Sequence, residues 1–204
     1  MAKPRAEAPA LLIMEQDHVE GAAAAAVTLV EYGDFECPYS REAVSTVQAL
    51  QSEFGHDLRF VFRHFPSAQK HPHAVQAAEA AEAAAAQGKF WAMYATLFSH
   101  QWELEYGDLM DYAGQLGLDR TRFSEALNKH RYLDRVRTDV GTGQQHGVTG
   151  TPTFFVNGRR QEGEDDAVAL RNAIHHMLRC KPHATDTGIS CSSYRDSGVS
   201  DRSR

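Results

Sequence analysis

Cysteine and long apolar runs are what this sequence has least of: its 204 residues include three cysteines, Cys37, Cys180 and Cys191. An odd and sparse set of cysteines does not make a disulfide framework, and their spacing matches no zinc-binding pattern. No apolar run approaches the roughly 20 residues that a membrane-spanning helix needs. The length is sufficient for one well-buried domain with an inserted subdomain, so we expect an ordinary soluble globular protein.

Positive charge is also scarce, because the net charge is −6 and no segment is dense in lysine or arginine. We therefore expect neither nucleic acid nor a membrane as a partner. Near the N-terminus the apolar stretch Leu11–Met14 is only four residues long, whereas the apolar core of a secretory signal needs about 7–15 residues. This pattern favours a cytoplasmic protein.

Histidine is plentiful, with 11 residues, but the histidines are scattered along the chain. The pairs His71/His73 and His175/His176 resemble ligand pairs at first sight. Neighbouring helical residues such as His175 and His176 point about 100° apart, so they do not converge on one ion. We expect no metal site and no bound cofactor.

The first part of the chain has the pattern of a βαβ unit. Residues 1–16 are rich in alanine and proline and predict a loose arm, and residues 17–21 predict a turn. A strand is then predicted over 27–32, a helix over 41–54 and a second strand over 58–65, joined by a right-handed crossover.

Residues 72–145 contain helical patterns only. An alanine-rich helix and an amphipathic aromatic helix come first, and three further helices follow. Asp108 and Asp119 are suited to the N-caps of two of these helices.

The last patterned segment returns to strands. Thr153–Val156 predicts a strand, Asn157-Gly158 predicts a tight hairpin turn, and a final helix is predicted over 165–180. The fold class is therefore α/β, with a helical block in the middle of the core. We divide the chain into five segments. They are a flexible arm (1–16), the first half of the core (17–71), a helical insertion (72–145), the second half of the core (146–180) and a disordered tail (181–204).

Cys37 lies between the first strand and the first helix, with Pro38 at the first helical position. The unpaired backbone N–H groups of a helix's first turn and the helix dipole favour an anion, so they favour a thiolate at this position. The alternative is a small buried cysteine that caps the helix. We interpret Cys37 as a nucleophile, and Cys180 and Cys191 as bystanders.

Glu31 shares one face of its strand with Val27 and Leu29. It either lies at the strand end and reaches solvent, or it is a partly buried carboxylate near Cys37. The residues alone leave both interpretations open.

Three separated segments resemble the DsbA-like branch of the thioredoxin superfamily. They are Val27-Thr-Leu-Val-Glu-Tyr-Gly-Asp-Phe-Glu-Cys37-Pro-Tyr, the pair His71-Pro-His-Ala and Gln87-Gly-Lys-Phe-Trp91-Ala-Met, and Gly150-Thr-Pro152-Thr-Phe-Phe-Val-Asn-Gly158. The resemblance covers about residues 17–178. The sequence is also similar to the thioredoxin-like domain fused to some bacterial sodium/proton antiporters.

The resemblance implies a thioredoxin fold with an inserted all-helical subdomain, and a Cys37 that attacks disulfides. It implies that the Thr151–Pro152 bond is cis and faces Cys37, so that a substrate peptide can pair with this backbone edge. We assign substrate binding to Pro38, Tyr39, Thr151 and Pro152. Glu31 matches the family's buried acid beneath the redox centre.

Ser40 departs from the dithiol pattern of the family, which has a second cysteine at this position. Without that cysteine, Cys37 can form a mixed disulfide but needs an external thiolate to resolve it. Glutathione is the expected co-substrate, and protein or small-molecule thiols and disulfides are the expected partners. The Ser40 hydroxyl is expected to donate a hydrogen bond to the Cys37 sulfur.

Two other functions stay open. Kappa-class glutathione transferases and chromene-carboxylate isomerases share the core and the insertion, but their serine stands where this chain has Cys37. A non-catalytic module that binds an extended peptide beside Pro152 is the alternative from a different class.

Overall fold

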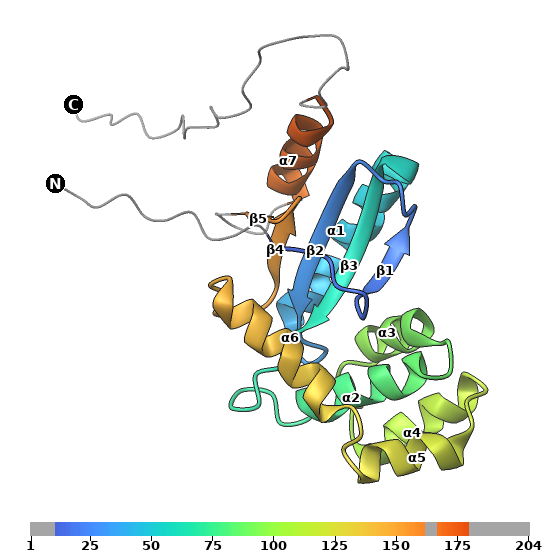
Figure 1. The fold of residues 1–204 in the computed structure, drawn as a ribbon. Coiled ribbons are helices and arrows are strands. Elements are labelled where there is room, and N and C mark those ends of the chain that lie inside the picture. Colours follow the sequence, from blue (N-terminus) through green and yellow to red (C-terminus); the bar gives the residue numbers. More distant parts are fainter. Residues whose placement is uncertain (1–10, 162–166, 180–204) are drawn as a thin grey trace, which may run out of the picture.

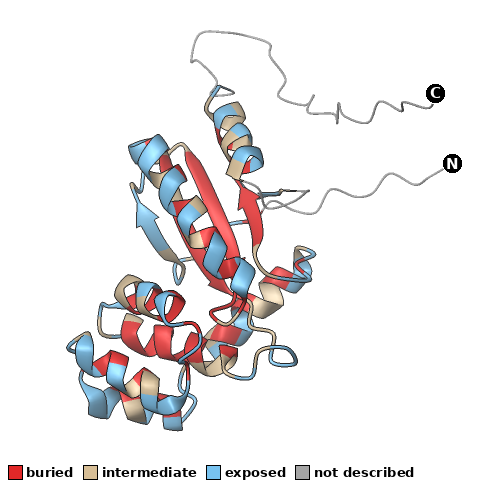
Figure 2. Ribbon diagram, turned by 180° about the vertical axis from the view of Figure 1, so that it is seen from behind, coloured by how far each residue is buried: buried red, intermediate tan, exposed pale blue. Residues whose placement is uncertain are grey.

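The structure is a computed structural model that describes residues 11–161 and 167–179 (Figure 1). A five-stranded sheet in the order β1-β3-β2-β4-β5 forms its centre. The two central strands, β2 (Val27–Gly33) and β3 (Leu58–His64), are parallel. Both strands are almost entirely buried, as Figure 2 shows for the middle of the sheet.

The outer strands are antiparallel to their neighbours. β1 (His18–Gly21) pairs with β3 on one side, and β4 (Thr153–Val156) pairs with β2 on the other. β5 (Arg159–Arg160) returns beside β4 after a turn at Asn157, where the backbone φ of 47° suits an asparagine. The predicted hairpin is therefore present.

One face of the sheet is covered by α1 (Pro38–Phe54) and α7 (Ala167–Arg179), as Figures 1 and 2 show. Val47 and Leu50 of α1 and Ile174 of α7 belong to one buried cluster with the strand residues of this face. A short 3₁₀ turn, η1 (Gly55–Asp57), ends α1 and leads into β3.

The opposite face of the sheet carries a smaller apolar cluster. Val30, Tyr32 and Val61 of the sheet pack there with Leu11 and Val148. The Tyr32 hydroxyl lies 3.0 Å from the hydroxyl of Thr142 in the helix that crosses this side of the molecule. The alternation along β2 therefore divides its side chains between two cores.

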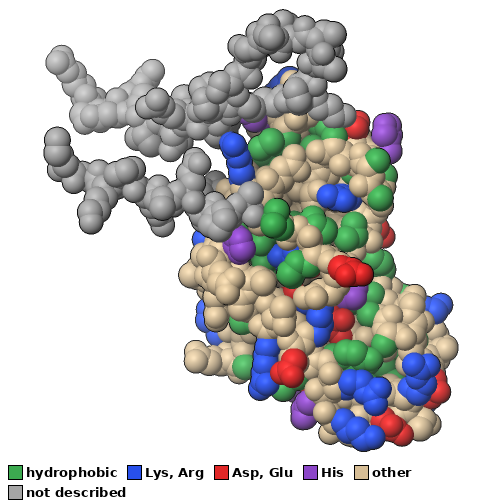
Figure 3. Space-filling view, in the orientation of Figure 1, with side chains coloured by type: hydrophobic (Ala, Val, Ile, Leu, Met, Phe, Trp, Pro, Cys, Tyr) green, Lys and Arg blue, Asp and Glu red, His purple; other side chains and the backbone are tan. Residues whose placement is uncertain are grey.

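Five helices lie between β3 and β4, and residues 72–145 contain no strand. They are α2 (Ala74–Ala85), α3 (Phe90–Ser99), α4 (Tyr106–Gln115), α5 (Arg120–Asn128) and α6 (Leu133–Gln145). The predicted α/β fold with an inserted helical subdomain is confirmed. None of the helices in the described part of the chain is long and apolar enough to cross a membrane. On the face seen in Figure 3, side chains of both charges are interspersed over this insertion.

Three local predictions differ from the structure. Residues 11–16 are not loose, because Leu11 is buried and its N–H donates to the carbonyl of Gly158. The segment predicted as a turn contains β1, which begins at His18 and pairs with β3. Asp108 is not an N-cap but the third residue of α4, where it forms a capping box with Glu105. The tail predicted from residue 181 lies outside the described residues.

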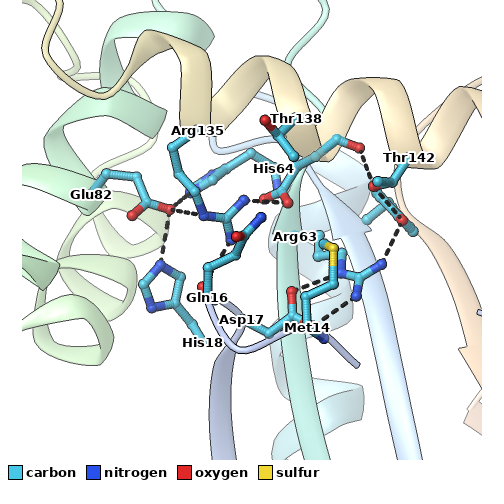
Figure 4. A network of polar contacts seen from close by, with 12 residues as sticks. Met14, Gln16, Asp17, His18, Arg63, His64, Glu82, Arg135, Thr138 and Thr142 are labelled. Carbon is cyan, nitrogen blue, oxygen red and sulfur yellow. Dashed lines mark hydrogen bonds and ion pairs between the residues drawn. The ribbon is translucent and has the colours of Figure 1, made fainter. Parts of the chain in front are cut away.

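A buried ion pair ties the segment before β1 to the sheet (Figure 4). Arg63 donates to the two carboxylate oxygens of Asp17 at 2.9 and 2.7 Å, and also to the Tyr32 hydroxyl and the Leu12 carbonyl. Both charged side chains are almost completely buried. This bidentate arrangement explains why residues 11–17 adopt a defined path over the sheet.

A second buried cluster joins the sheet to the insertion (Figure 4). The Glu82 carboxylate oxygen Oε1 accepts hydrogen bonds of 2.9 Å from Nε2 of both His18 and His64. Arg135 of α6 has its Nε 3.7 Å from the same oxygen and also pairs with Asp139. The cluster therefore connects β1, β3, α2 and α6.

Glu82 is expected to stabilise the fold through its charge. Burial alone would raise the pKa of Glu82, but hydrogen bonds from His18 and His64 hold it below its ordinary value of 4.5. A carboxyl with a lowered pKa in the folded state stabilises the protein above its ordinary pKa, and this stabilisation is lost as the pH falls below that value. We expect Glu82→Gln to lower the free energy of unfolding by about 3 kcal/mol near neutral pH.

Urea unfolding of the parent and of Glu82→Gln, at neutral pH and at a series of lower pH values, measures this effect. The difference between them should shrink as the pH falls below 4.5, the ordinary value for Glu82. Glu125→Gln, at an exposed position in α5, is the control and should change little at any pH. A difference that stays constant across the series would contradict a role for the charge.

Candidate active site

Cys37 is the N-cap of α1, with extended backbone angles of φ −80° and ψ 120° and with Pro38 at the first helical position. Its N–H donates to the Asp34 carbonyl at 3.1 Å, and its own carbonyl accepts the N–H of Arg41 at 3.2 Å. The predicted placement of this cysteine at a helix N-terminus is confirmed. The N–H groups of the first turn are therefore oriented toward the region of the sulfur.

The segment before β4 lies against Cys37. The Cys37 Sγ donates to the Thr151 carbonyl at 3.3 Å, and the Thr151–Pro152 peptide bond is cis. Two segments that are 114 residues apart in the sequence thus meet at the sulfur. Cys37 itself is only 4% exposed, whereas Tyr39, two residues further along, is 67% exposed, so the exposed surface nearest to Cys37 in the sequence is the start of α1.

Asp34 organises the loop that carries Cys37, although it was not predicted as a site residue. Its buried carboxylate accepts hydrogen bonds from the N–H groups of Glu36 and Ser67 and from the imidazole Nδ1 of His71, at 2.8–2.9 Å. The side chain of Asp34 is fully buried. The loop after β2 is therefore fixed to the loop after β3. The only sequence signal was an acidic residue directly after a buried strand.

A second contact between the same two loops is made by Glu36. Its carboxylate accepts from the His73 backbone N–H at 2.7 Å and lies 3.0 Å from His73 Nδ1. The two histidines that resembled a metal-ligand pair, His71 and His73, thus each bind a separate carboxylate beside Cys37. They position the loop instead of converging on one point.

Gln101, from the loop between α3 and α4, holds Cys37 from the side of the insertion. Its side-chain Nε2 donates to the carbonyls of Phe35 and Cys37 at 2.9 and 2.8 Å, and the residue is 2% exposed. No motif in the sequence marks this glutamine, because its partners are main-chain atoms 64 and 66 residues away.

Replacing Gln101 by methionine, which has a similar shape but no donor, is expected to destabilise the protein. The change leaves the buried carbonyls of Phe35 and Cys37 without this donor, so the free energy of unfolding should fall by about 1–3 kcal/mol. Denaturant unfolding measures the loss, with Gln48→Met on the exposed surface of α1 as the control. Equal stabilities of the two variants would show that the Gln101 bonds contribute little.

Ser40 is fully buried in the first turn of α1. Its hydroxyl oxygen accepts the N–H of Asp34 at 3.3 Å. The expected hydrogen bond from this hydroxyl to the Cys37 sulfur is absent from the contacts of the described residues, and the sulfur donates to Thr151 instead. The structure therefore gives Ser40 a role in holding the loop.

Glu31 does not reach solvent, since it is 0% exposed in the middle of the sheet. It lies on the face that also carries Leu29, between Phe62 of β3 and Phe154 of β4. Burial raises the pKa of Tyr94 in α3, and the nearby charge of Glu31 raises it further. The interpretation that Glu31 reaches solvent is therefore wrong and the burial of its carboxylate is confirmed, whereas its proximity to Cys37 stays a prediction.

Glycine is required at position 33, at the end of β2. A Cβ at Gly33 would lie 2.9 Å from the Glu31 carboxylate oxygen and would also collide with the ring of Phe62. Only glycine, which has no side chain, therefore fits at position 33 beside the Glu31 carboxylate and the Phe62 ring.

A family model described as thioredoxin matches residues 14–176, which is most of the chain. The chain belongs to the thioredoxin family. A curated relative, the "Na(+)/H(+) antiporter NhaA 1" of Salinispora arenicola, is 49% identical over 160 residues. The match covers 78% of this chain and 24% of that protein, so the chain spans about a quarter of the length of this relative.

Solved structures of this family have the same DsbA-like fold. A thioredoxin-like oxidoreductase from Silicibacter pomeroyi superposes with a TM-score of 0.72 and 27% identity, over 81% of this chain and 94% of that one. The alpha-DsbA1 protein of Wolbachia pipientis superposes with a TM-score of 0.71 and 18% identity, over 83% of this chain and 94% of that one. The resemblance inferred from the sequence is therefore confirmed at the level of family and fold.

Proposed function

We propose that this protein is a thiol–disulfide oxidoreductase that uses Cys37 as its single nucleophile and glutathione as the resolving thiol. The observation that carries the proposal is the position of Sγ, at the N-terminus of α1 and 3.3 Å from the Thr151 carbonyl. The 27% identity to a thioredoxin-like oxidoreductase supports the same class of activity.

The proposed reaction has two exchange steps. The Cys37 thiolate attacks one sulfur of a disulfide, a Cys37–S bond forms, and the other sulfur leaves as a thiolate. A glutathione thiolate then attacks the mixed disulfide and releases Cys37 as a thiolate. With a glutathionylated substrate, the sum is one substrate thiol and one oxidised glutathione, formed from one mixed disulfide and one reduced glutathione.

The Cys37 sulfur carries a negative charge before the first step and again after the second, when it is released. The helix dipole and the free N–H groups at the start of α1 stabilise this charge. Ser40 cannot carry out the second step, because a hydroxyl forms no disulfide, and this supports the need for an external thiol. We place the reaction in the cytoplasm, where thiols are kept reduced.

The substrate is proposed to lie over the exposed Pro38 and Tyr39 and along the backbone edge of Thr151 and Pro152. Thr151 and Pro152 are partly exposed, and Thr151 already contacts the sulfur through its carbonyl. An extended peptide can add to such an edge through main-chain hydrogen bonds.

Mass spectrometry after exposure to oxidised glutathione tests the proposal. We expect one glutathione adduct on Cys37, identified by peptide mapping, and its removal by reduced glutathione. A control peptide with an ordinary thiol is treated in parallel. If the control is modified and Cys37 is not, the proposed reaction is refuted.

A peptide-binding module without catalysis is the second candidate, and the 4% exposure of Cys37 favours it. This second function predicts that an extended peptide binds equally well to the parent and to Cys37→Ala. It also predicts that the parent forms no glutathione adduct on Cys37.

A further inference from the structure

His18, His64 and Glu82 come from three different elements and meet at one point inside the protein. His18 is the first residue of β1, His64 is the last residue of β3, and Glu82 lies in α2. One nitrogen from each imidazole and one carboxylate oxygen all lie within 4.8 Å of one another. Figure 4 shows His18 and Glu82 facing each other at this point, between the insertion and the sheet.

Both imidazoles are oriented by aromatic rings. The ring of His18 is stacked on Phe90, with centroids 3.5 Å apart and an angle of 9° between the planes. His64 packs against both Phe35 and Phe62, with centroids 5.9 and 5.6 Å away. Their Nε2 atoms are thereby directed to the same carboxylate oxygen, each at 2.9 Å. Ligand atoms that already converge need little rearrangement to bind a cation.

We propose that His18, His64 and Glu82 form a binding site for one divalent transition-metal ion, with zinc as the best-fitting ion. Two imidazole nitrogens and one carboxylate oxygen are ligands that zinc commonly takes, at about 2.0–2.2 Å. Ligand atoms around a tetrahedral zinc ion stand roughly 3.3 Å apart at such bond lengths. Two of the present separations, from Nε2 of each histidine to the Glu82 oxygen, are 2.9 Å, and the two nitrogens lie within 4.8 Å of each other, so a local adjustment of the three side chains brings them to this spacing.

The route to the site and its fourth ligand follow from the burial of the three residues. The His64 side chain is 1% exposed and that of Glu82 is 7% exposed, whereas that of His18 is 16% exposed. A cation therefore enters beside His18, and a water molecule on this side completes the four ligands.

Protons compete with the metal for this site. Each Nε2 now donates its hydrogen to Glu82, so before it can bind a metal that hydrogen has to move to Nδ1 or to solvent. The other charged groups that face the cluster are Arg135 and Asp139 of α6, which pair with each other. Arg135 also has its Nε 3.7 Å from Glu82, so a cation binds against this neighbouring positive charge.

Cobalt titration of the full chain tests the proposal, after chelator treatment and after blocking all thiols with iodoacetamide. We expect saturation at one equivalent, visible absorption of tetrahedral cobalt without a sulfur-to-cobalt band, and displacement by zinc. No saturable binding, or a cobalt spectrum unchanged by the protein, would overturn the proposal and leave the cluster as an ion-pair network.

Variants locate the site. His18→Gln should weaken zinc binding by at least about tenfold, whereas His56→Gln, whose side chain is 91% exposed, should bind as the parent does. Zinc should raise the thermal midpoint of the parent and of His56→Gln but not that of His18→Gln. Circular dichroism checks that each variant is folded. If His18→Gln does not fold, His64→Gln removes the other histidine ligand in its place. Unchanged zinc binding in a folded variant of either histidine would place the metal elsewhere and refute the proposal.

Discussion

Cys37→Ser is expected to lose catalysed disulfide exchange completely. A serine hydroxyl is not ionised near neutral pH and forms no disulfide, so neither step of the proposed reaction remains. Removal of the nucleophile from enzymes that act through a covalent intermediate costs at least about a thousandfold in rate. We expect the variant to show only the uncatalysed rate of exchange between a glutathionylated peptide and reduced glutathione, measured by coupled reduction of the oxidised glutathione formed.

The control for this result is a variant in which Cys180 and Cys191 are both replaced by serine. These two cysteines are predicted to be bystanders, so this variant should retain the full rate. Loss of activity in the double variant, or its persistence in Cys37→Ser, would mean that another thiol carries the reaction. Similar folding of all the proteins is checked by denaturant unfolding.

The elements that the sequence predicted well are those whose residues interact with near neighbours. The stripe of apolar residues in α1 and the turn at Asn157-Gly158 follow from periods and turn preferences that act over a few positions. β1 was missed because His18–Gly21 has no strand alternation of its own. It is a strand because it pairs with β3, some 40 residues further along the chain, and tertiary context overrides so short a pattern.

The candidate site likewise contains residues that could be predicted from their neighbours in the sequence and residues that could not. Cys37 and its helix were predicted from adjacent residues, and Thr151 and Pro152 only from the resemblance to a family. Gln101 could not be predicted, because its partners are backbone atoms brought near by the fold. Asp34 was missed because two of its three partners are backbone N–H groups and the third, His71, is 37 residues away. Main-chain partners leave no signature in residue identity, since every residue but proline offers the same N–H and carbonyl groups.

Ser40→Cys is expected to change the product of oxidation. Ser40 lies three residues after Cys37 in the first turn of α1 and is completely buried. Residues at this spacing on a helix have Cβ atoms about 5–6 Å apart, which is somewhat longer than the ~4 Å of a disulfide. Cys37 is the N-cap, just outside the helix, so a small adjustment of its extended backbone closes the bond. A second thiol here can therefore attack the mixed disulfide on Cys37 and expel glutathione.

After exposure to oxidised glutathione, the parent should carry an adduct, whereas Ser40→Cys should carry an internal bond between positions 37 and 40 and no adduct. Peptide mapping by mass spectrometry distinguishes the two products, in proteins where Cys180 and Cys191 are replaced by serine. Ser40→Ala is the matched control: it loses the 3.3 Å contact with the Asp34 N–H but has no second thiol, so it should keep the adduct. If Ser40→Cys accumulates the same adduct as the parent, a cysteine at position 40 does not resolve the mixed disulfide. The dependence of Cys37 on an external thiol would then have another cause than the missing cysteine.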